Sequence, residues 1–215
     1  MAEEQNLINL TEKNSITFRG TVTGNSVDRY GKKLLQLSAN NKRDAELFLV
    51  LDSPGGSIYA GSQFITIMQS IPQKVSCIVK FAASMSHSIL QYCTGNRYSL
   101  PNGVSMIHRA RGGFYGQFND GEVEKKLEFW KSIVGRMEEV NAKRMKMTLK
   151  DYKKYAKDEF WCYGYNCKKW NFVDKMTNVT CSKKLIEGKE SLTISSYFGK
   201  RKVTYSLCPL LNQSL

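Results

Sequence analysis

Four side chains in this sequence are candidates for nucleophilic catalysis: Ser84, His87, His108 and Asp158. A serine hydroxyl attacks a carbonyl carbon when a neutral imidazole accepts its proton and a carboxylate orients that imidazole. His87 lies three residues after Ser84. If both lie on one helix, the His87 ring points along the helix axis and not towards the serine hydroxyl. We therefore favour His108 as the base.

The pattern around Ser84 predicts a strand, a tight turn and a helix. A short apolar run at 75–79 is followed by small residues and then by helical spacing at 85–93. Ser84 would lie at the helix N-terminus, where free backbone N–H groups and the helix dipole stabilise negative charge. On this stretch alone an ordinary N-cap serine is the better interpretation.

The segment Asp52-Ser53-Pro54-Gly55-Gly56 follows an apolar run at 45–51 that is typical of a strand in a parallel sheet. Glycines let backbone N–H groups approach a ligand, so these residues could bind a carbonyl oxyanion together with the N–H after Ser84. Each feature alone has an ordinary explanation. The glycines fit a strand–helix turn, His108 a half-buried histidine, and Asp158 a solvated loop carboxylate.

The first half of the chain alternates between apolar runs and amphipathic stretches, which predicts a layered α/β fold. A glycine-rich loop at 111–116 lacks the lysine and serine of a phosphate-binding loop. The expected strands are 15–20, 45–51, 75–79, 97–100 and 104–108, and the expected helices are 25–37 (capped by Asn25 or Ser26), 58–71 and 85–93.

The second half predicts a long helix that starts near Asp120 and carries one apolar stripe. Its members recur by threes and fours: Val123, Leu127, Trp130, Val134, Met137 and Val140. The stripe fits either a core-facing helix or a contact with another subunit. Further expected elements are a helix from Thr148 to Ala156, a strand at 172–176, and a β-hairpin around residues 199–201.

The composition is that of a globular protein of one or two domains, with 215 residues, 41% apolar and 24% charged. The net charge is +13, but acidic residues interleave with the lysines, which favours a solvated surface over a nucleic-acid site. No apolar stretch is long enough to span a membrane. The N-terminus lacks a secretory signal, which predicts a cytoplasmic protein and leaves other export routes open.

The six cysteines form no CxxC pair, and with only two histidines we expect no zinc site. Cys77 lies in an apolar run and Cys93 late in a helical pattern, where a free thiol behaves as a small hydrophobic group. In a reducing compartment we expect all six to be thiols.

Taken together, the motifs resemble the proteolytic subunit of the Clp protease. They are Ser53-Pro54-Gly55-Gly56, Ala82-Ala83-Ser84-Met85, Met106-Ile107-His108 and Lys157-Asp158-Glu159-Phe160. The resemblance runs from about Ile16 to Met176. It implies Ser84 as the nucleophile, His108 as the general base, Asp158 as its orienting acid, and an oxyanion hole formed by the N–H groups of Gly56 and Met85. The implied reaction is peptide-bond hydrolysis through an acyl-enzyme, without a metal or other cofactor.

The same resemblance implies an α/β superhelix of the ClpP/crotonase group. The helix at about 120–145 would be a handle between two stacked rings, commonly of seven subunits, that enclose the active sites. Such a homo-oligomer acts on polypeptides with an AAA+ unfoldase, and we expect no membrane or nucleic-acid partner. We divide the chain into a flexible segment (1–14), a peptidase domain (15–177) and a C-terminal extension (178–215) that forms a β-hairpin.

This sequence departs from the family pattern beside the nucleophile. Lys80-Phe81 replaces the usual Gly-Gln, Ser86 a glycine, and Asp52 an asparagine. The short segment before Ile16 suggests reduced axial loops. The main alternative function is therefore a weak or inactive ring subunit with a scaffold role. An acyl-CoA enzyme of the crotonase group and a peptidase with a Ser-Lys dyad fit less well, because the first does not use a Ser-His-Asp set and the second is normally membrane-anchored.

Overall fold

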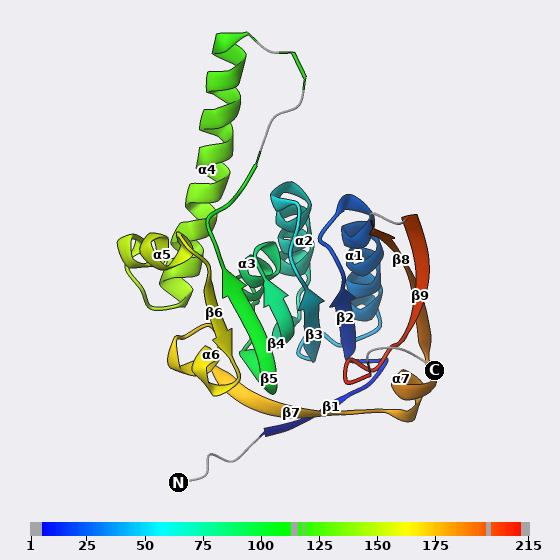
Figure 1. Ribbon diagram of the computed structural model, residues 1–215. Helices are drawn as coiled ribbons and strands as arrows, with labels where there is room; N and C mark the ends of the chain where they lie inside the picture. Colours follow the sequence, from blue (N-terminus) through cyan, green and yellow to red (C-terminus); the bar gives the residue numbers. More distant parts are fainter. Residues whose placement is uncertain (1–5, 113–115, 118, 197–198, 212–215) are drawn as a thin grey trace.

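The computed structural model describes residues 6–112, 116–117, 119–196 and 199–211, and the chain has the expected mixed α/β fold (Figure 1). One sheet has the strand order β1-β7-β5-β4-β3-β2, with β6 paired to β5. Every pairing in it is parallel except β5–β6. Its strands are β1 (Asn6–Leu10), β2 (Ser15–Arg19), β3 (Glu46–Ser53), β4 (Lys74–Ala83), β5 (Arg97–Ile107), β6 (Phe160–Tyr163) and β7 (Lys175–Cys181).

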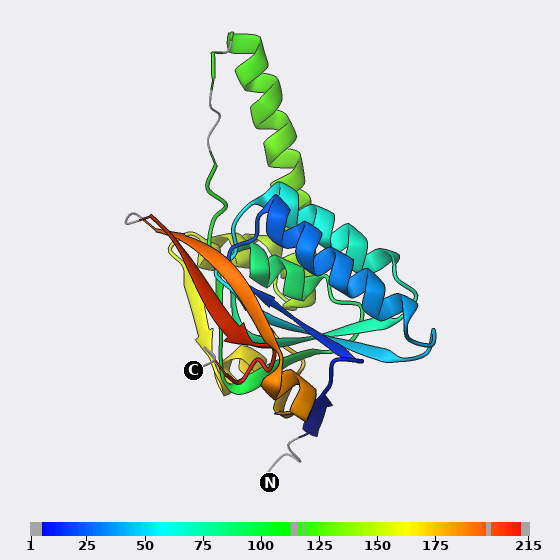
Figure 2. The same ribbon diagram turned by 90° about the vertical axis from the view of Figure 1, so that its right-hand side faces the viewer.

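The helices connect these strands, and α1 and α2 lie side by side over one face of the sheet (Figure 2). The longest, α4, extends well beyond the body of the molecule (Figure 1). The bounds are α1 (Gly24–Ala39), α2 (Ile58–Ser70), α3 (Met85–Gln91), α4 (Asp120–Arg144), α5 (Leu149–Ala156), α6 (Tyr165–Lys169) and α7 (Lys183–Glu187).

The central strands read as continuous apolar runs because both faces of the sheet are buried. Along β3, Leu49 and Leu51 face the core formed with α1, α2 and α3. Val50 and, on β4, Ile78 face a second cluster with Leu10, Val179, Leu185 and Cys208. Residues of β1, β7, α7 and the C-terminal segment thus cover the opposite face.

The C-terminal extension contains the expected antiparallel hairpin, β8 (Lys189–Ser196) and β9 (Gly199–Ser206). It lies beside α1 at the β2 edge of the sheet (Figure 1). Glu190 accepts hydrogen bonds from Tyr30 Oη at 3.0 Å and Lys33 Nζ at 2.7 Å, and Arg19 Nη1 donates to the Ser206 carbonyl at 3.0 Å. The hairpin is therefore joined to the main fold by buried and half-buried polar contacts.

Several boundaries differ from those expected. Within the segment 1–14 that we expected to be flexible, Asn6–Leu10 forms β1, which gives the edge of β7 a parallel partner. The expected boundary after residue 177 falls inside β7. Residues 97–108 form one long strand up to Ile107, with an irregular pairing to β4. Phe172 and Val173, expected on a strand, are core residues that precede β7.

The helices α2 and α3 begin at residues 58 and 85 as expected, whereas α1 begins at residue 24, one residue earlier than expected. Thr23 caps α1, in place of Asn25 or Ser26, and Asn119 caps α4 in a reciprocal bond pair with Glu122. Parts of three predicted features lie outside the described residues: the flexible N-terminus (1–5), the glycine-rich loop (113–115) and the hairpin turn (197–198).

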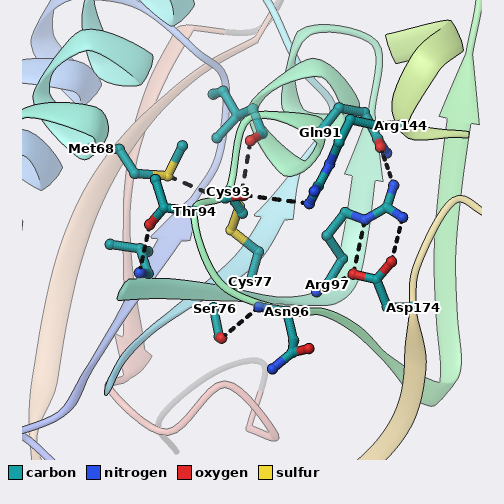
Figure 3. Close-up of a disulfide and its surroundings, with 12 residues drawn as sticks. Met68, Ser76, Cys77, Gln91, Cys93, Thr94, Asn96, Arg97, Arg144 and Asp174 are labelled. Atoms are coloured by element: carbon teal, nitrogen blue, oxygen red, sulfur yellow. Dashed lines mark hydrogen bonds and ion pairs between the residues drawn. A yellow bond between two sulfur atoms is a disulfide. The ribbon is translucent and has the colours of Figure 1, made fainter. Parts of the chain in front are cut away.

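The cysteines are paired, which corrects the expectation of six thiols. The disulfides are Cys77–Cys93, Cys162–Cys167 and Cys181–Cys208. Figure 3 shows the first of them, which joins β4 to the residues just after α3, beside an ion pair between the buried Arg97 and the exposed Asp174. The sequence did not indicate this pairing because the fold brings together cysteines that lie in different elements. None of the described helices is long and apolar enough to cross a membrane.

Candidate active site

Ser84 occupies a sharp turn between β4 and α3. Its backbone has φ 56° and ψ −122°, a conformation that residues other than glycine rarely adopt. The surrounding structure fixes this turn, because Ser84 N donates to the Met106 carbonyl of β5 at 2.9 Å. The disulfide between Cys77 and Cys93 joins the strand before the turn to the end of the helix after it. The serine is thus held at a helix N-terminus by three elements of the fold.

The glycines of the Pro54-Gly55-Gly56 segment allow a second loop to approach this turn. A Cβ atom added to Gly55 would lie 2.6 Å from the Ala83 carbonyl oxygen and 2.7 Å from Met85 N. Gly55 also has a positive φ of 90°. Only glycine satisfies both conditions, since a side chain would collide with backbone atoms on either side of Ser84.

The structure brings Ser84 and His108 together. His108 follows β5 directly, and its Nε2 lies 2.7 Å from Ser84 Oγ. Both side chains are half-buried at the carboxyl ends of neighbouring parallel strands. This distance allows a neutral imidazole to accept the hydroxyl proton.

Asp158 does not meet His108 in this conformation. Residue 158 lies in the exposed turn between α5 and β6, where Arg109 N donates to the Ala156 carbonyl at 2.6 Å. The two backbones are therefore neighbours. Within the described residues, however, the buried Nδ1 of His108 has no hydrogen-bond partner, and the Asp158 carboxylate makes neither a hydrogen bond nor an ion pair. The role of Asp158 stays a prediction.

The residue between Asp158 and β6 has an unusual conformation. Glu159 has a positive φ of 68°. Its carboxylate accepts a hydrogen bond from Trp161 Nε1 at 3.1 Å and lies 3.8 Å from Arg111 Nη2. These contacts join Glu159 to Trp161 and Arg111, directly beside the exposed Asp158.

His87 lies in the core and not at the site. It is fully buried, and its Nδ1 lies 2.9 Å from the hydroxyl of Ser105, which itself donates to the Ala82 carbonyl. Burial, together with the positive charge of Arg97, lowers the pKa of His87 to about 3. The geometry therefore favours His108 over His87 as the base for Ser84.

The two groups predicted to bind an oxyanion line the same cavity as Ser84. Met85 is the first residue of α3, so its N–H has no acceptor within the helix. Gly56 pairs with Val22 through its neighbours, since Val22 N donates to Gly55 O and Ser57 N donates to Val22 O. In a parallel bridge of this kind the N–H of the central residue points away from the partner strand.

The cavity has a volume of about 230 Å³ and extends from Ser84 towards α4 and α5. Sequence reasoning did not identify its inner wall, because the residues there come from three helices and belong to no motif. The lining residues are Gly56, Ile58, Ser84, Met85, Ser88, Ile107, His108, Ala110, Arg111, Val134, Met137, Glu138, Asn141 and Tyr152.

Two of the departures from the family pattern compensate each other. Lys80 Nζ lies 3.1 Å from Asp52 Oδ2, and Arg19 Nε lies 3.2 Å from the same oxygen. A third altered residue, Ser86, is fully buried, and the fourth, Phe81, is half-buried with its ring centroid 6.5 Å from that of Trp161. None of the four altered residues lines the cavity.

Comparisons with known proteins agree with this architecture. The family model described as Clp protease matches residues 2–180, which includes β1 to β6 and all but the last residue of β7 and leaves out the hairpin. The chain is 31% identical to "ATP-dependent Clp protease proteolytic subunit 1" of Streptomyces avermitilis, over 70% of this chain and 69% of that protein. It is 38% identical to "ATP-dependent Clp protease proteolytic subunit 3" of Streptomyces coelicolor, over 52% of each. The chain therefore belongs to the Clp protease family.

Proposed function

We propose that this chain is a serine-type endopeptidase that hydrolyses peptide bonds through an acyl-enzyme on Ser84. The hydrogen-bond distance of 2.7 Å between Ser84 Oγ and His108 Nε2 carries the proposal. In the described part of the chain it is the one contact between a nucleophilic hydroxyl and an accessible base at the end of a cavity. A serine placed only to cap α3 would bond to a backbone N–H, and Ser84 makes no such cap bond.

In the proposed mechanism Ser84 Oγ attacks the substrate carbonyl carbon while His108 Nε2 takes the hydroxyl proton. The N–H groups of Gly56 and Met85 stabilise the oxyanion. His108 then gives the proton to the departing amine, and the acyl-enzyme forms. A water molecule, deprotonated by His108, releases the acid and regenerates Ser84.

Asp158 completes this mechanism after a small rearrangement of its turn. Arg109 N donates to the Ala156 carbonyl, so the segment before Asp158 lies beside the residue after His108, and we propose that a rearrangement of this turn brings the carboxylate to Nδ1. There it would accept a hydrogen bond and stabilise the imidazolium. The unpartnered Nδ1 of His108 supports this step, since a buried ring nitrogen is stabilised by a partner.

We further propose that the chain forms a homo-oligomer of stacked, seven-membered rings that enclose the sites and act with an AAA+ unfoldase. The helix α4 extends beyond the body of the molecule and exposes large apolar side chains: Val123 is 41%, Leu127 39% and Phe129 65% exposed. A protruding helix of this composition is expected to pack against another subunit. The names of the similar Streptomyces proteins, which are ATP-dependent, support an ATP-consuming partner.

A fluorophosphonate probe tests the proposed chemistry. The wild-type protein should be labelled on Ser84, as shown by mass mapping, and should cleave unstructured peptides. The Ser84→Ala variant should lose both properties, whereas Ser70→Ala, at the exposed end of α2, should keep them. Equal labelling of Ser84→Ala would contradict the proposal. Light scattering on the same samples tests the assembly, which a monomer at micromolar concentration would contradict.

A further inference from the structure

The cavity beside Ser84 has a polar inner wall that the proposed chemistry does not use. Its members are Ser88 of α3, Asn141 of α4 and Tyr152 of α5. Their exposed fractions are 7%, 2% and 4%, so each is more than nine-tenths buried. Three polar side chains from three helices thus meet at the inner end of a substrate-sized cavity.

The hydrogen bonds within this wall are incomplete. Asn141 Nδ2 donates to Ser88 Oγ at 3.0 Å and to Tyr152 Oη at 3.1 Å, which uses both amide hydrogens. Asn141 Oδ1 is buried and has no partner among the described residues. Each hydroxyl, while it accepts from the amide, keeps its own hydrogen to donate. Burial raises the pKa of Tyr152 to about 12, so its hydroxyl stays protonated at neutral pH.

The wall therefore offers one unpaired hydrogen-bond acceptor and two hydroxyl hydrogens that can be donated, all of them shielded from water. A buried polar atom without a partner is destabilising, and native proteins contain few of them. The rest of the wall consists largely of apolar side chains from Ile58, Ile107, Val134 and Met137. This combination fits a ligand with an apolar stem and a head that both donates and accepts hydrogen bonds.

The distance from the nucleophile identifies the part of the substrate that would reach this wall. Ser88 follows Ser84 by one helical turn, and Ser88 N donates to the Ser84 carbonyl at 3.2 Å. One turn advances about 5.4 Å. Ser84 attacks the carbonyl carbon of one substrate residue, and we call that residue the acyl residue. Its side chain starts at Cβ, two bonds from that carbon, so a chain of three or four atoms spans this distance.

We propose that the cavity binds the side chain of the acyl residue and selects a carboxamide, glutamine or asparagine. The amide NH₂ group of the substrate donates to Asn141 Oδ1, and the amide oxygen accepts from the Ser88 or Tyr152 hydroxyl. The methylene groups pack against the apolar walls. This inference rests on the proposed peptidase function and names the substrate class of that same site.

Other side chains satisfy the wall less well. A leucine would leave the acceptor and both donors unpartnered. A charged head at this depth would lack a counterion, because the two charges that also line the cavity already have partners. Glu138 lies 3.5 Å from Lys153 Nζ, and Arg111 lies 3.8 Å from Glu159.

Peptidyl phosphonate probes that differ only in the acyl residue test this selectivity on the full chain. The measured quantity is the rate of covalent labelling of Ser84, which does not require turnover. Glutamine or asparagine should label at least about tenfold faster than norleucine, which has a similar length and no amide, and faster than glutamate. Equal rates, or a preference for norleucine, glutamate or lysine, would overturn the proposal.

Two variants locate the effect. Tyr152→Phe removes one hydroxyl with little change in shape and should reduce the preference for glutamine over norleucine. Asn141→Leu should reverse it. Val140→Leu, on the same helix but outside the cavity lining, is the matched control and should keep the wild-type preference. An unchanged preference in both Tyr152→Phe and Asn141→Leu would overturn the role of this wall.

A small fluorophosphonate without a peptide separates the two levels of the argument. It should label Ser84 in the wild type and in the Val140→Leu control at similar rates, because Val140 lies outside the cavity lining. If this reagent and every peptidyl probe fail to label Ser84, the proposed peptidase function is wrong. The carboxamide selectivity, which rests on that function, is then wrong as well. Labelling by the small reagent without carboxamide preference rejects the pocket alone.

Discussion

The nucleophile and the carboxylate of the proposed triad are held in very different ways. Ser84 lies in a turn fixed by β4, α3, a bond to β5 and the glycine loop beside it. Asp158 lies in an exposed turn, and its side chain has no hydrogen-bond or ion-pair partner within the described residues. The fold of a single subunit therefore defines the Ser84–His108 pair, whereas the position of Asp158 depends on a three-residue segment.

This difference shows which part of the proposed triad can change its conformation. Ser84 Oγ and His108 Nε2 are in contact within a single chain. The proposed role of Asp158 requires a change of backbone conformation near Glu159, whose positive φ costs about 1–3 kcal/mol. Release of that conformation would offset part of the cost of the movement.

The first prediction concerns the fixed side of the site. His108→Ala should lower turnover of a peptide substrate by about 10⁴-fold or more, because Ser84 loses its base. The folded fraction at 25 °C should not change, as His108 is only half-buried. The comparison with His87→Gln sharpens the test, since that variant keeps the Ser84–His108 pair. A dead His87→Gln variant beside an active His108→Ala variant would show that the base is misassigned.

The second prediction concerns the loosely held side. Asp158→Asn should lower turnover by about 10²-fold or more, because an amide does not stabilise the imidazolium. Thermal stability should stay within about 0.5 kcal/mol of the wild type, as expected for an exposed side chain without partners. Glu159→Gln is the matched control for charge in the same turn and should retain turnover within a few-fold. Normal turnover in Asp158→Asn would mean that Ser84 and His108 work without this carboxylate.

The same contrast explains how much of the site could be predicted from the sequence. Ser84 and His108 belong to local patterns, a strand–turn–helix and the end of an apolar strand, so their positions followed from short-range signals. The motif that contains Asp158 was equally visible, but its side-chain direction depends on the conformation of Glu159. Asn141 lies beside the predicted stripe on α4, and its contacts with Ser88 and Tyr152 are tertiary.

The fold shows the same division between local and long-range information. The alternating apolar and amphipathic stretches predicted the parallel sheet and the helices that cover it. The strand β1 was not predicted, because its five polar and apolar residues become a strand only through pairing with β7. The disulfides were not predicted for a similar reason, since Cys181 and Cys208 are 27 residues apart and meet only after α7 and the hairpin have folded.

The third prediction tests whether covalent closure supports the fixed side. The Cys77–Cys93 disulfide spans 16 residues and encloses the Ser84 turn. The double variant Cys77→Ala/Cys93→Ala should lose about 3 kcal/mol of unfolding free energy in urea. The double variant Cys181→Ala/Cys208→Ala is the control. It should loosen the C-terminal hairpin, and it should not slow the labelling of Ser84 by the fluorophosphonate probe. If only the loss of the Cys181–Cys208 disulfide slowed the labelling of Ser84, the Cys77–Cys93 disulfide would not be what supports the Ser84 turn.

The last prediction uses the two histidines, which repeat the contrast between an enclosed and an accessible group. His87 is fully buried, with a pKa lowered to about 3 by burial and the nearby Arg97, whereas an unfolded chain has a histidine pKa of 6.5. A group whose pKa is depressed in the folded state stabilises the fold above the unfolded pKa, and this stabilisation is lost as pH falls towards the folded pKa.

Between pH 7 and pH 5 the unfolded chain therefore takes up a proton at His87 that the folded protein does not. This linkage should remove about 2 kcal/mol of unfolding free energy over that interval. The variant His87→Gln should lack this part of the pH dependence, although it is less stable overall because a packed core side chain is replaced. His108→Gln, at the accessible site, is the matched control and should retain it. Urea unfolding at pH 7, 6 and 5 gives the slopes, and equal slopes for the wild type and His87→Gln would mean that His87 does not remain neutral in the core.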